Sequence, residues 1–182
     1  MSFKKNSRDQ LEIDDPRAMR ALAHPVRLDL LTALSDGPLT ATECAERVGE
    51  SPQSCSYHLR TLAKYGFVER AEAGNGKERP WQKLAGGLQW TGTDDTGAAR
   101  ALASTFLARD FRLLQQYLAA PPESWPEPMY SQAVLRLTPA ESQELGMAIF
   151  RLLEPYFPKK RREAPADAVD VSWVGFAVPR EP

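Results

Sequence analysis

The chain has 182 residues, 42% hydrophobic and 26% charged, which is a globular composition long enough for one large or two small domains. Its net charge of −1 argues against a protein that coats nucleic acid over its whole surface. No apolar run is long enough to cross a bilayer, and the start, MSFKKNSRDQ, lacks the apolar stretch of a secretory signal. Two cysteines make no disulfide framework, so we expect a cytoplasmic protein with reduced thiols.

Two proline-containing dipeptides mark the start of the first two predicted helices. Asp15-Pro16 and His24-Pro25 each place a capping candidate before a proline, which is favoured at the first helical position. The second of these helices ends at the breaker SDGPLT. Residues 1–15 show no such feature, and we expect them to form a flexible tail.

The next two predicted helices are short and joined by a turn. A capping box, TATE at 40–43, starts the third helix, and a Ser-Pro pair at 51–52 starts the fourth. Two short helices joined by a glycine-containing turn predict a helix-turn-helix. Cys44 and Cys55 fall on the apolar stripes of these two helices, where free cysteine is usually a core residue.

A charged hairpin follows, in which FVERAEA and RPWQKL flank an Asn75-Gly76 turn. Helix, turn, helix and charged hairpin is the plan of a winged helix. Six basic and three acidic residues lie between Ser51 and Lys83, so positive charge is concentrated here. The fourth helix begins with uncharged polar side chains, which suit base edges and phosphates in a major groove. The residues that we predict to contact DNA are Ser51, Gln53, Ser54, Ser56, Tyr57, His58, Arg60, Lys64, Lys77 and Arg79.

The composition of the chain changes after Leu84. A glycine-rich connection leads to a long Ala-rich helix predicted over 96–119, whose apolar surface suits a dimer contact. A strand candidate at 131–137, a helix from Pro139 and a final strand, VDVSWVGFAV, predict a strand-helix-strand extension. The residues that this helix is expected to bury are Leu145, Ile149, Leu152 and Leu153. Core or dimer contacts, or the walls of a small-ligand pocket, are predicted at Trp90, Trp125, Trp173, Phe106 and Tyr117.

The predicted fold class is therefore mainly α with a small β component (α+β). Residues 16–84 form a winged helix-turn-helix domain, and residues 85–182 form a dimerisation region that can also hold an effector pocket.

The stretch RALAHPVRLDLLTAL, followed by ATECAERVGESPQSCSYHLRTLAKYGFVER, resembles the ArsR-type winged-helix repressors. The resemblance covers residues 16–84. It implies a homodimer that binds double-stranded operator DNA, an inverted repeat, with the second paired helix in the major groove and the wing on the backbone. The family pattern S.HL..L...G.V is matched by Ser56, His58, Leu59, Leu62, Gly66 and Val68.

The same resemblance bears on metal ions. The family's best-known metal sensors carry a C.C pair where this chain has Thr40 and Thr42. A second class uses His and Asp on the long C-terminal helix, where residues 96–119 contain no histidine and one aspartate, Asp110. Cys44 and Cys55 stand where the family has core leucine and often valine. We therefore expect no metal site and no cofactor.

Three alternatives to a DNA-binding repressor are a winged helix that holds a protein partner, a regulator that responds to a small molecule bound in its C-terminal region, and an enzyme fragment. Lys77, Arg79 and Lys83 in the wing count against the first. Some methyltransferases carry an N-terminal winged helix, but residues 85–182 are too few for their nucleotide-binding domain and lack its glycine-rich loop. With no Ser/His/Asp or paired-carboxylate constellation visible, we expect a regulator and not an enzyme.

Overall fold

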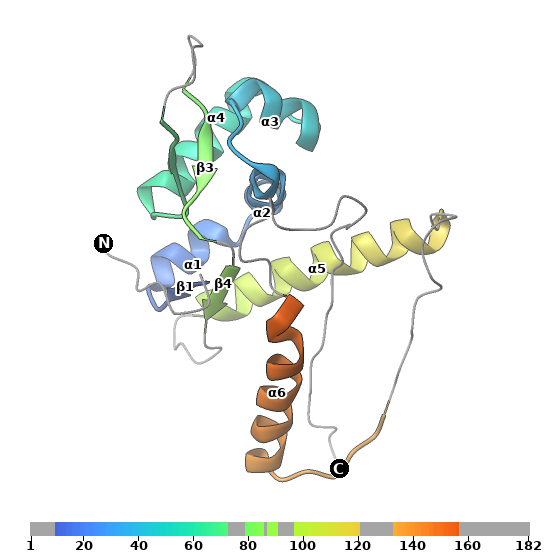
Figure 1. Cartoon of the computed structure of the whole chain (residues 1–182). Helices are drawn as coiled ribbons and strands as arrows, with labels where there is room; N and C mark the ends of the chain where they lie inside the picture. The colour runs from blue at the N-terminus through green and yellow to red at the C-terminus, as the bar shows by residue number, and fades with distance from the viewer. Residues whose placement is uncertain (1–9, 73–78, 86, 91–96, 121–132, 157–182) are drawn as a thin grey trace. The chain divides into compact units, whose positions relative to one another are not determined.

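The computed structural model describes residues 10–72, 79–85, 87–90, 97–120 and 133–156. The chain divides into two units, Met1–Arg112 and Leu113–Pro182, which are described separately. The described elements are mainly helices, with two small two-stranded sheets, which is the α+β class that the sequence predicts (Figure 1). Within the described part of the chain, no helix has both the length and the apolar character needed to cross a membrane.

The four helices predicted in the first half of the chain are all present. Helices α1 (Pro16–Leu22) and α2 (Pro25–Ala33) both begin at a proline, and the short 3-10 helix η1 (Leu34–Asp36) follows α2. Helices α3 (Ala41–Val48) and α4 (Pro52–Lys64) form the predicted helix-turn-helix.

Local capping explains where three of these four helices begin. The side chains of Asp15, Thr40 and Ser51 each accept a backbone N–H bond at the start of α1, α3 and α4. His24 also occupies a cap position, at the start of α2, but its side chain makes no capping bond. The proline that follows His24 therefore marks the start of α2 without help from the imidazole.

The wing is an antiparallel pair, β2 (Val68–Arg70) with β3 (Trp81–Lys83), in which Arg70 lies opposite Trp81. Leu39 adds to the other edge of β3, because its N–H and C=O both bond to the backbone of Trp81, at 2.9 and 2.7 Å. The predicted Asn75-Gly76 turn lies outside the described residues.

A second sheet corrects the prediction of a flexible tail over 1–15 for residues 10–13, and residues 1–9 lie outside the described residues. Strand β1 (Gln10–Ile13) pairs in parallel with β4 (Gly87–Trp90), which lies within the predicted glycine-rich connection. Leu11 and Ile13 are buried, so the alternate side chains of β1 belong to the core of the first unit. Parallel strands are not joined by a local hairpin turn that could be recognised in the sequence, so this pairing was not predicted.

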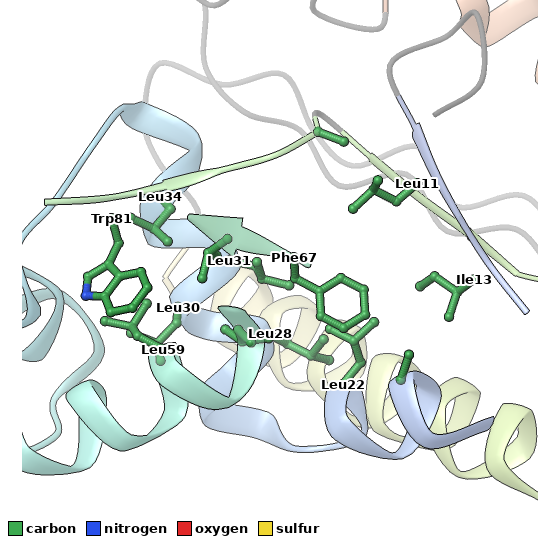
Figure 2. Packing of buried hydrophobic residues seen from close by; sticks show 14 of the residues in the cluster. Leu11, Ile13, Leu22, Leu28, Leu30, Leu31, Leu34, Leu59, Phe67 and Trp81 are labelled. Atoms are coloured by element: carbon green, nitrogen blue, oxygen red, sulfur yellow. The ribbon is translucent and has the colours of Figure 1, made fainter. Parts of the chain in front are cut away.

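The core of the first unit combines apolar side chains from α1, α2, α4 and both sheets. Figure 2 shows part of this core, including Leu22 of α1, Leu28 of α2, Leu59 of α4 and Trp81 of the wing. Because α2 contributes Leu28, Leu30 and Leu31, and Leu34 of η1 follows directly, this segment is the central one against which the others pack.

The long predicted helix is α5 (Ala98–Ala119), and the boundary between the two units falls within it, after Arg112. The second unit contains the described helices α6 (Pro139–Leu153) and η2 (Glu154–Tyr156), and α6 opens with the Thr138–Glu141 capping box.

The predicted strand-helix-strand extension is wrong in its first part. Residues 133–138 form no strand, and the final strand lies outside the described residues. The burial predicted for α6 is also wrong, because none of its side chains is buried and Leu152 is 73% exposed. An apolar stripe predicts which face of a helix would pack, but it does not supply the surface that covers it.

Candidate nucleic-acid interface

Helices α3 and α4 are joined by a tight turn. Gly49 ends α3 in the left-handed conformation, with φ of 72°, which a residue with a side chain adopts at a cost. Ser51 then starts α4, because its Oγ accepts the N–H of Ser54 at 3.1 Å. The turn therefore fixes how α4 leaves α3, and the core-facing residues Cys55, Leu59 and Leu62 hold α4 against the rest of the domain.

The opposite face of α4 is polar and open to solvent. Ser51, Gln53, Tyr57, Arg60 and Lys64 are exposed, and Tyr57 is 62% exposed although it is a large aromatic residue. The half-buried members of the predicted set are Ser54 and Ser56. Seven of the ten predicted DNA contacts thus lie on this side of α4, where uncharged polar groups come first and positive charges follow one to three turns later.

His58 is the exception, and its assignment to this face is corrected. Only 8% of His58 is exposed, and it lies with Cys55, Leu59 and Leu62 on the buried side of α4. Its Nδ1 accepts a hydrogen bond from Nε of Arg27 at 3.2 Å. A ring held inward by another helix cannot reach a base edge, so His58 leaves the set of predicted DNA contacts.

In the wing, Arg79 is exposed and Lys77 lies outside the described residues. The structure adds a basic residue that the sequence analysis did not select, Arg70 of β2. Its guanidinium lies 3.8 Å from the centre of the Trp81 ring, and its Nη1 donates to the carbonyl of Arg79. Pairing Arg70 with Trp81 across the hairpin register would have identified this contact from the sequence.

Both cysteines are packing residues, as predicted. Cys44 and Cys55 are free and fully buried. Burial raises the pKa of the Cys44 thiol to about 11, and it also raises the pKa of Cys55. Thr40 is occupied in the capping box of α3, where its Oγ1 accepts the N–H of Glu43 at 3.2 Å. The described residues contain no cluster of three or more His, Cys, Asp or Glu side chains that could hold a metal ion.

A cavity of about 210 Å³ lies in the first unit, away from α3 and the exposed face of α4. Its walls are largely apolar, and Trp90 of β4 stacks on Phe106 of α5 at 5.0 Å between ring centres. Two basic residues also line it, Lys83 and Arg109. Arg109 is already engaged, since its Nη2 donates to Thr32 Oγ1 at 2.7 Å.

Helix α5 buries its first turns and exposes a stripe of large apolar side chains further along. Ala98, Ala99 and Leu102 are buried in the core of the first unit. The exposed residues recur at alternating steps of four and three, the spacing of a coiled-coil seam. They are Leu107, Phe111, Leu114 and Leu118.

Comparison with known proteins identifies the paired helices. Residues 22–71 match a family model described as "Helix-turn-helix domain". The chain is 43% identical over 56 residues to the HTH-type transcriptional regulator NmtR of Mycobacterium tuberculosis, a match over 31% of this chain and 47% of that protein. It is 41% identical over 58 residues to the "Probable mercury resistance operon repressor" of Streptomyces lividans, over 32% of this chain and 46% of the relative. The match thus spans less than half the length of either relative.

Two solved structures are similar to part of this chain, at low similarity. One is the homodimeric winged helix-turn-helix DNA-binding domain Mb0332 from Mycobacterium bovis, 23% identical with a TM-score of 0.36, covering 54% of this chain and 81% of that one. The other is an ArsR-like transcriptional regulator from Rhodococcus sp. RHA1, 26% identical with a TM-score of 0.34, covering 57% and 90%. On the family match and the sequence identity to the two relatives, residues 22–71 are a helix-turn-helix domain similar to those of HTH-type transcriptional regulators.

Proposed function

We propose that this protein is a sequence-specific transcriptional regulator of the ArsR type, a repressor that binds operator DNA as a homodimer. The observation that carries this proposal is the division of α4 into a fully buried apolar face and an exposed polar face, within a matched helix-turn-helix domain. In such domains the second helix enters the major groove and the wing contacts the backbone.

In this proposal the exposed residues of α4 have two jobs. Gln53, Ser54 and Tyr57, on the first turns, contact base edges, and Ser51 and Ser56 support them through phosphate or base contacts. The positively charged residues contact phosphates, which orients the protein on the duplex without reading its sequence. These residues are Arg60 and Lys64 on α4, and Lys77 and Arg79 in the wing.

Selection of bound duplexes from a random DNA pool tests this function directly. We expect an enriched inverted repeat with half-sites about one helical turn, ~34–36 Å, apart. Gln53→Ala should cost about 1–3 kcal/mol on the selected duplex and relax one position. Arg79→Ala should weaken specific and random DNA alike and lower the salt slope by about one. A pool without any enriched motif would instead favour the protein-partner alternative.

The stripe on α5 supports the homodimer. Seam residues at coiled-coil spacing pack against an equivalent helix, and a charge placed in the seam disrupts that packing. Light scattering should therefore give a dimer for the wild type and a monomer for Phe111→Glu. Gln116→Glu, on the same helix but outside the stripe, is the matched control and should remain a dimer. A monomeric wild type at micromolar concentration would remove this part of the proposal.

A metal response is not part of the proposal, although one relative is named as a mercury resistance repressor. Here the thiols of Cys44 and Cys55 are buried, and Thr40 and Thr42 stand at the positions of the sensors' cysteine pair. Zinc, cadmium or arsenite should therefore leave the affinity for the selected duplex unchanged. Stoichiometric metal binding that releases DNA would contradict this expectation.

The cavity favours a second candidate function, a regulator that responds to a small molecule. The sequence analysis expects such a pocket in residues 85–182, and half of the residues that line this cavity come from that range, including the predicted wall residues Trp90 and Phe106. Aromatic walls with Lys83 and Arg109 nearby suit a small aromatic anion. In an NMR titration, millimolar benzoate should shift the Trp90 and Phe106 ring signals more than neutral benzamide does. The absence of shifts with either probe would remove this candidate.

A further inference from the structure

A partly buried polar cluster joins α2 to the inward face of α4. His24 lies at the start of α2, Arg27 one turn later, and His58 in the middle of α4. Nε of Arg27 donates to Nδ1 of His58 at 3.2 Å, and Nη1 of the same guanidinium donates to the carbonyl of Ala21. The His24 ring lies 4.5 Å from the His58 ring, centre to centre.

This geometry defines the charge state of His58. An Nδ1 atom that accepts a hydrogen bond carries no proton, so the imidazole is neutral and its proton is on Nε2. A proton on Nδ1 would replace an acceptor with a donor and place a second positive charge against the guanidinium. Protonation of His58 therefore breaks the bond that ties α4 to α2.

The surroundings of the cluster also favour the neutral form of both imidazoles. Burial, His24 and Arg27 lower the pKa of His58, in that order of size, and the carboxylate of Glu50 opposes them. Burial and then Arg27 lower the pKa of His24, again against Glu50. From α4 itself, the ring of Tyr57 meets His58 edge-on at 5.2 Å. Burial lowers the pKa of Arg27, and the nearby Tyr57 and Tyr65 oppose this effect.

His58 sits on the helix whose opposite face is proposed to read DNA. A rotation or shift of α4 at this position moves the adjacent Tyr57 and, one turn earlier, Ser54. Recognition of base edges requires these side chains to keep their geometry, whereas phosphate contacts tolerate small displacements. The cluster can thus influence sequence-specific binding without touching the duplex.

We propose that Arg27 and His58 are positioning residues for the DNA-reading helix, and that protonation of the His24–His58 pair weakens sequence-specific DNA binding. This inference rests on the proposed DNA-binding function. The predicted direction of the pH effect on DNA affinity is distinctive, because protonated histidines on a DNA-facing surface add positive charge and tighten binding as pH falls. Here a neutral cluster supports the binding-competent helix, so acidification loosens binding.

The linkage follows from the direction of the pKa shifts. A histidine whose pKa is lowered in the folded protein stabilises the fold above its ordinary pKa of about 6.5, and this contribution is lost as pH falls through the folded value. If binding requires the neutral form, affinity falls by up to about tenfold for each pH unit below the titration midpoint of the free protein. His24 and His58 are the two histidines of the chain, so a histidine transition in the full-length protein reports on this cluster.

The first experiment measures affinity for the duplex selected from the random pool, and for a scrambled duplex, from about pH 7.5 to pH 5.5. The wild type should lose affinity for the selected duplex with little change on the scrambled one, while circular dichroism stays constant. His58→Gln keeps an acceptor for Arg27 but does not titrate, so most of the pH dependence should disappear. Tighter binding at low pH, or equal pH dependence in His58→Gln, would overturn the proposal, as would loss of helical signal in step with affinity.

Two variants of Arg27 separate geometry from charge. Arg27→Met removes the donor and the charge, whereas Arg27→Lys keeps the charge but cannot bridge His58 and Ala21 with a planar fork. Both should lose specific affinity at neutral pH while keeping most of the affinity for scrambled DNA. Wild-type affinity in Arg27→Lys would show that the charge alone matters.

The decisive measurement needs no DNA. NMR titration of the two imidazole rings should give a higher midpoint for His58 in Arg27→Met than in the wild type, because the opposing positive charge is gone. An unchanged midpoint would overturn the positioning role even if the DNA-binding function were correct. A shifted midpoint combined with a pool that yields no motif would instead locate the failure in the proposed function.

Discussion

Ile13→Ala tests the strand that makes residues 10–13 part of the fold. Ile13 is the last residue of β1, lies opposite Trp90 of β4 in the parallel register, and is 2% exposed. Its neighbour Glu12 points to the other side of the strand and is exposed. The two positions therefore offer a buried and an exposed substitution within one short strand.

The expected cost follows from what the substitution removes. Ile→Ala deletes about three carbon atoms, worth ~0.8 kcal/mol each for transfer from water, and it leaves a cavity whose lining loses contacts. We expect a loss of about 3 kcal/mol in the free energy of unfolding. Ile13→Val should cost about 1 kcal/mol, and Glu12→Ala should stay within about 0.5 kcal/mol of the wild type.

Urea unfolding followed by far-ultraviolet circular dichroism measures these differences, with the m-value as a check on cooperativity. The ranking Ile13→Ala, Ile13→Val, Glu12→Ala is the expected order of destabilisation. If Ile13→Ala were as stable as Glu12→Ala, β1 would not be packed in solution, and the N-terminal segment would be the flexible tail that its sequence suggests.

Two further predictions concern local features of α3. Thr40→Ala should cost about 1 kcal/mol in the same urea experiment, because it removes the side-chain cap of α3. The hydrogen bonds from Thr40 to Glu43, from its backbone and then its side chain, lower the pKa of that carboxyl. The part of the capping box that depends on the Glu43 carboxylate should therefore be present above about pH 4.5 and be lost as pH falls further, which urea unfolding at several pH values checks. Cys44, with its pKa raised to about 11 by burial, should resist a disulfide exchange reagent until the protein unfolds. Rapid stoichiometric labelling of the native thiol would show that it is accessible.

The features that the sequence predicted correctly are those with a local cause. Each of the helices α1, α3 and α4 begins at a capping residue that can be recognised within four positions of the chain. The wing follows from the two short segments FVERAEA and RPWQKL on either side of a turn dipeptide. For these elements the residues that determine the structure are neighbours in the sequence.

The features that it missed depend on distant partners. Gln10–Ile13 is too short to be distinguished from a tail, and it becomes a strand only because Gly87–Trp90 lies beside it. The apolar stripe of α6 was read as a buried face, yet Leu152 is exposed. Periodicity indicates that a face is apolar, but whether the face is covered is decided by segments far away in the chain.

His58 shows the same limit within the candidate site. By helical spacing it lies between the buried Cys55 and Leu59 and the exposed Tyr57, so the pattern of α4 alone allows either face. Arg27 of α2 determines that His58 faces inward, because its partly buried guanidinium needs a hydrogen-bond acceptor. A basic residue one turn after His-Pro was visible in the sequence, but its distance to α4 was not.

Helix α2 also makes polar contacts with α5, and the exposure of these contacts determines how much they stabilise the packing of the two helices. Asp29 accepts from Nε of Arg109 at 3.3 Å and from Nη2 of Arg112 at 3.3 Å, and the Arg112 side chain is 48% exposed. An ion pair exposed to the degree of Arg112 contributes about 1 kcal/mol or less, because water and salt screen it, whereas the Arg109 side chain is 15% exposed. Ala98, Ala99 and Leu102, which are buried in the core, hold the first turns of α5. On the α4 side, the bond from Arg27 to His58 is partly buried and His58 itself is 8% exposed, so water screens this contact less than it screens the pair of Arg112 and Asp29.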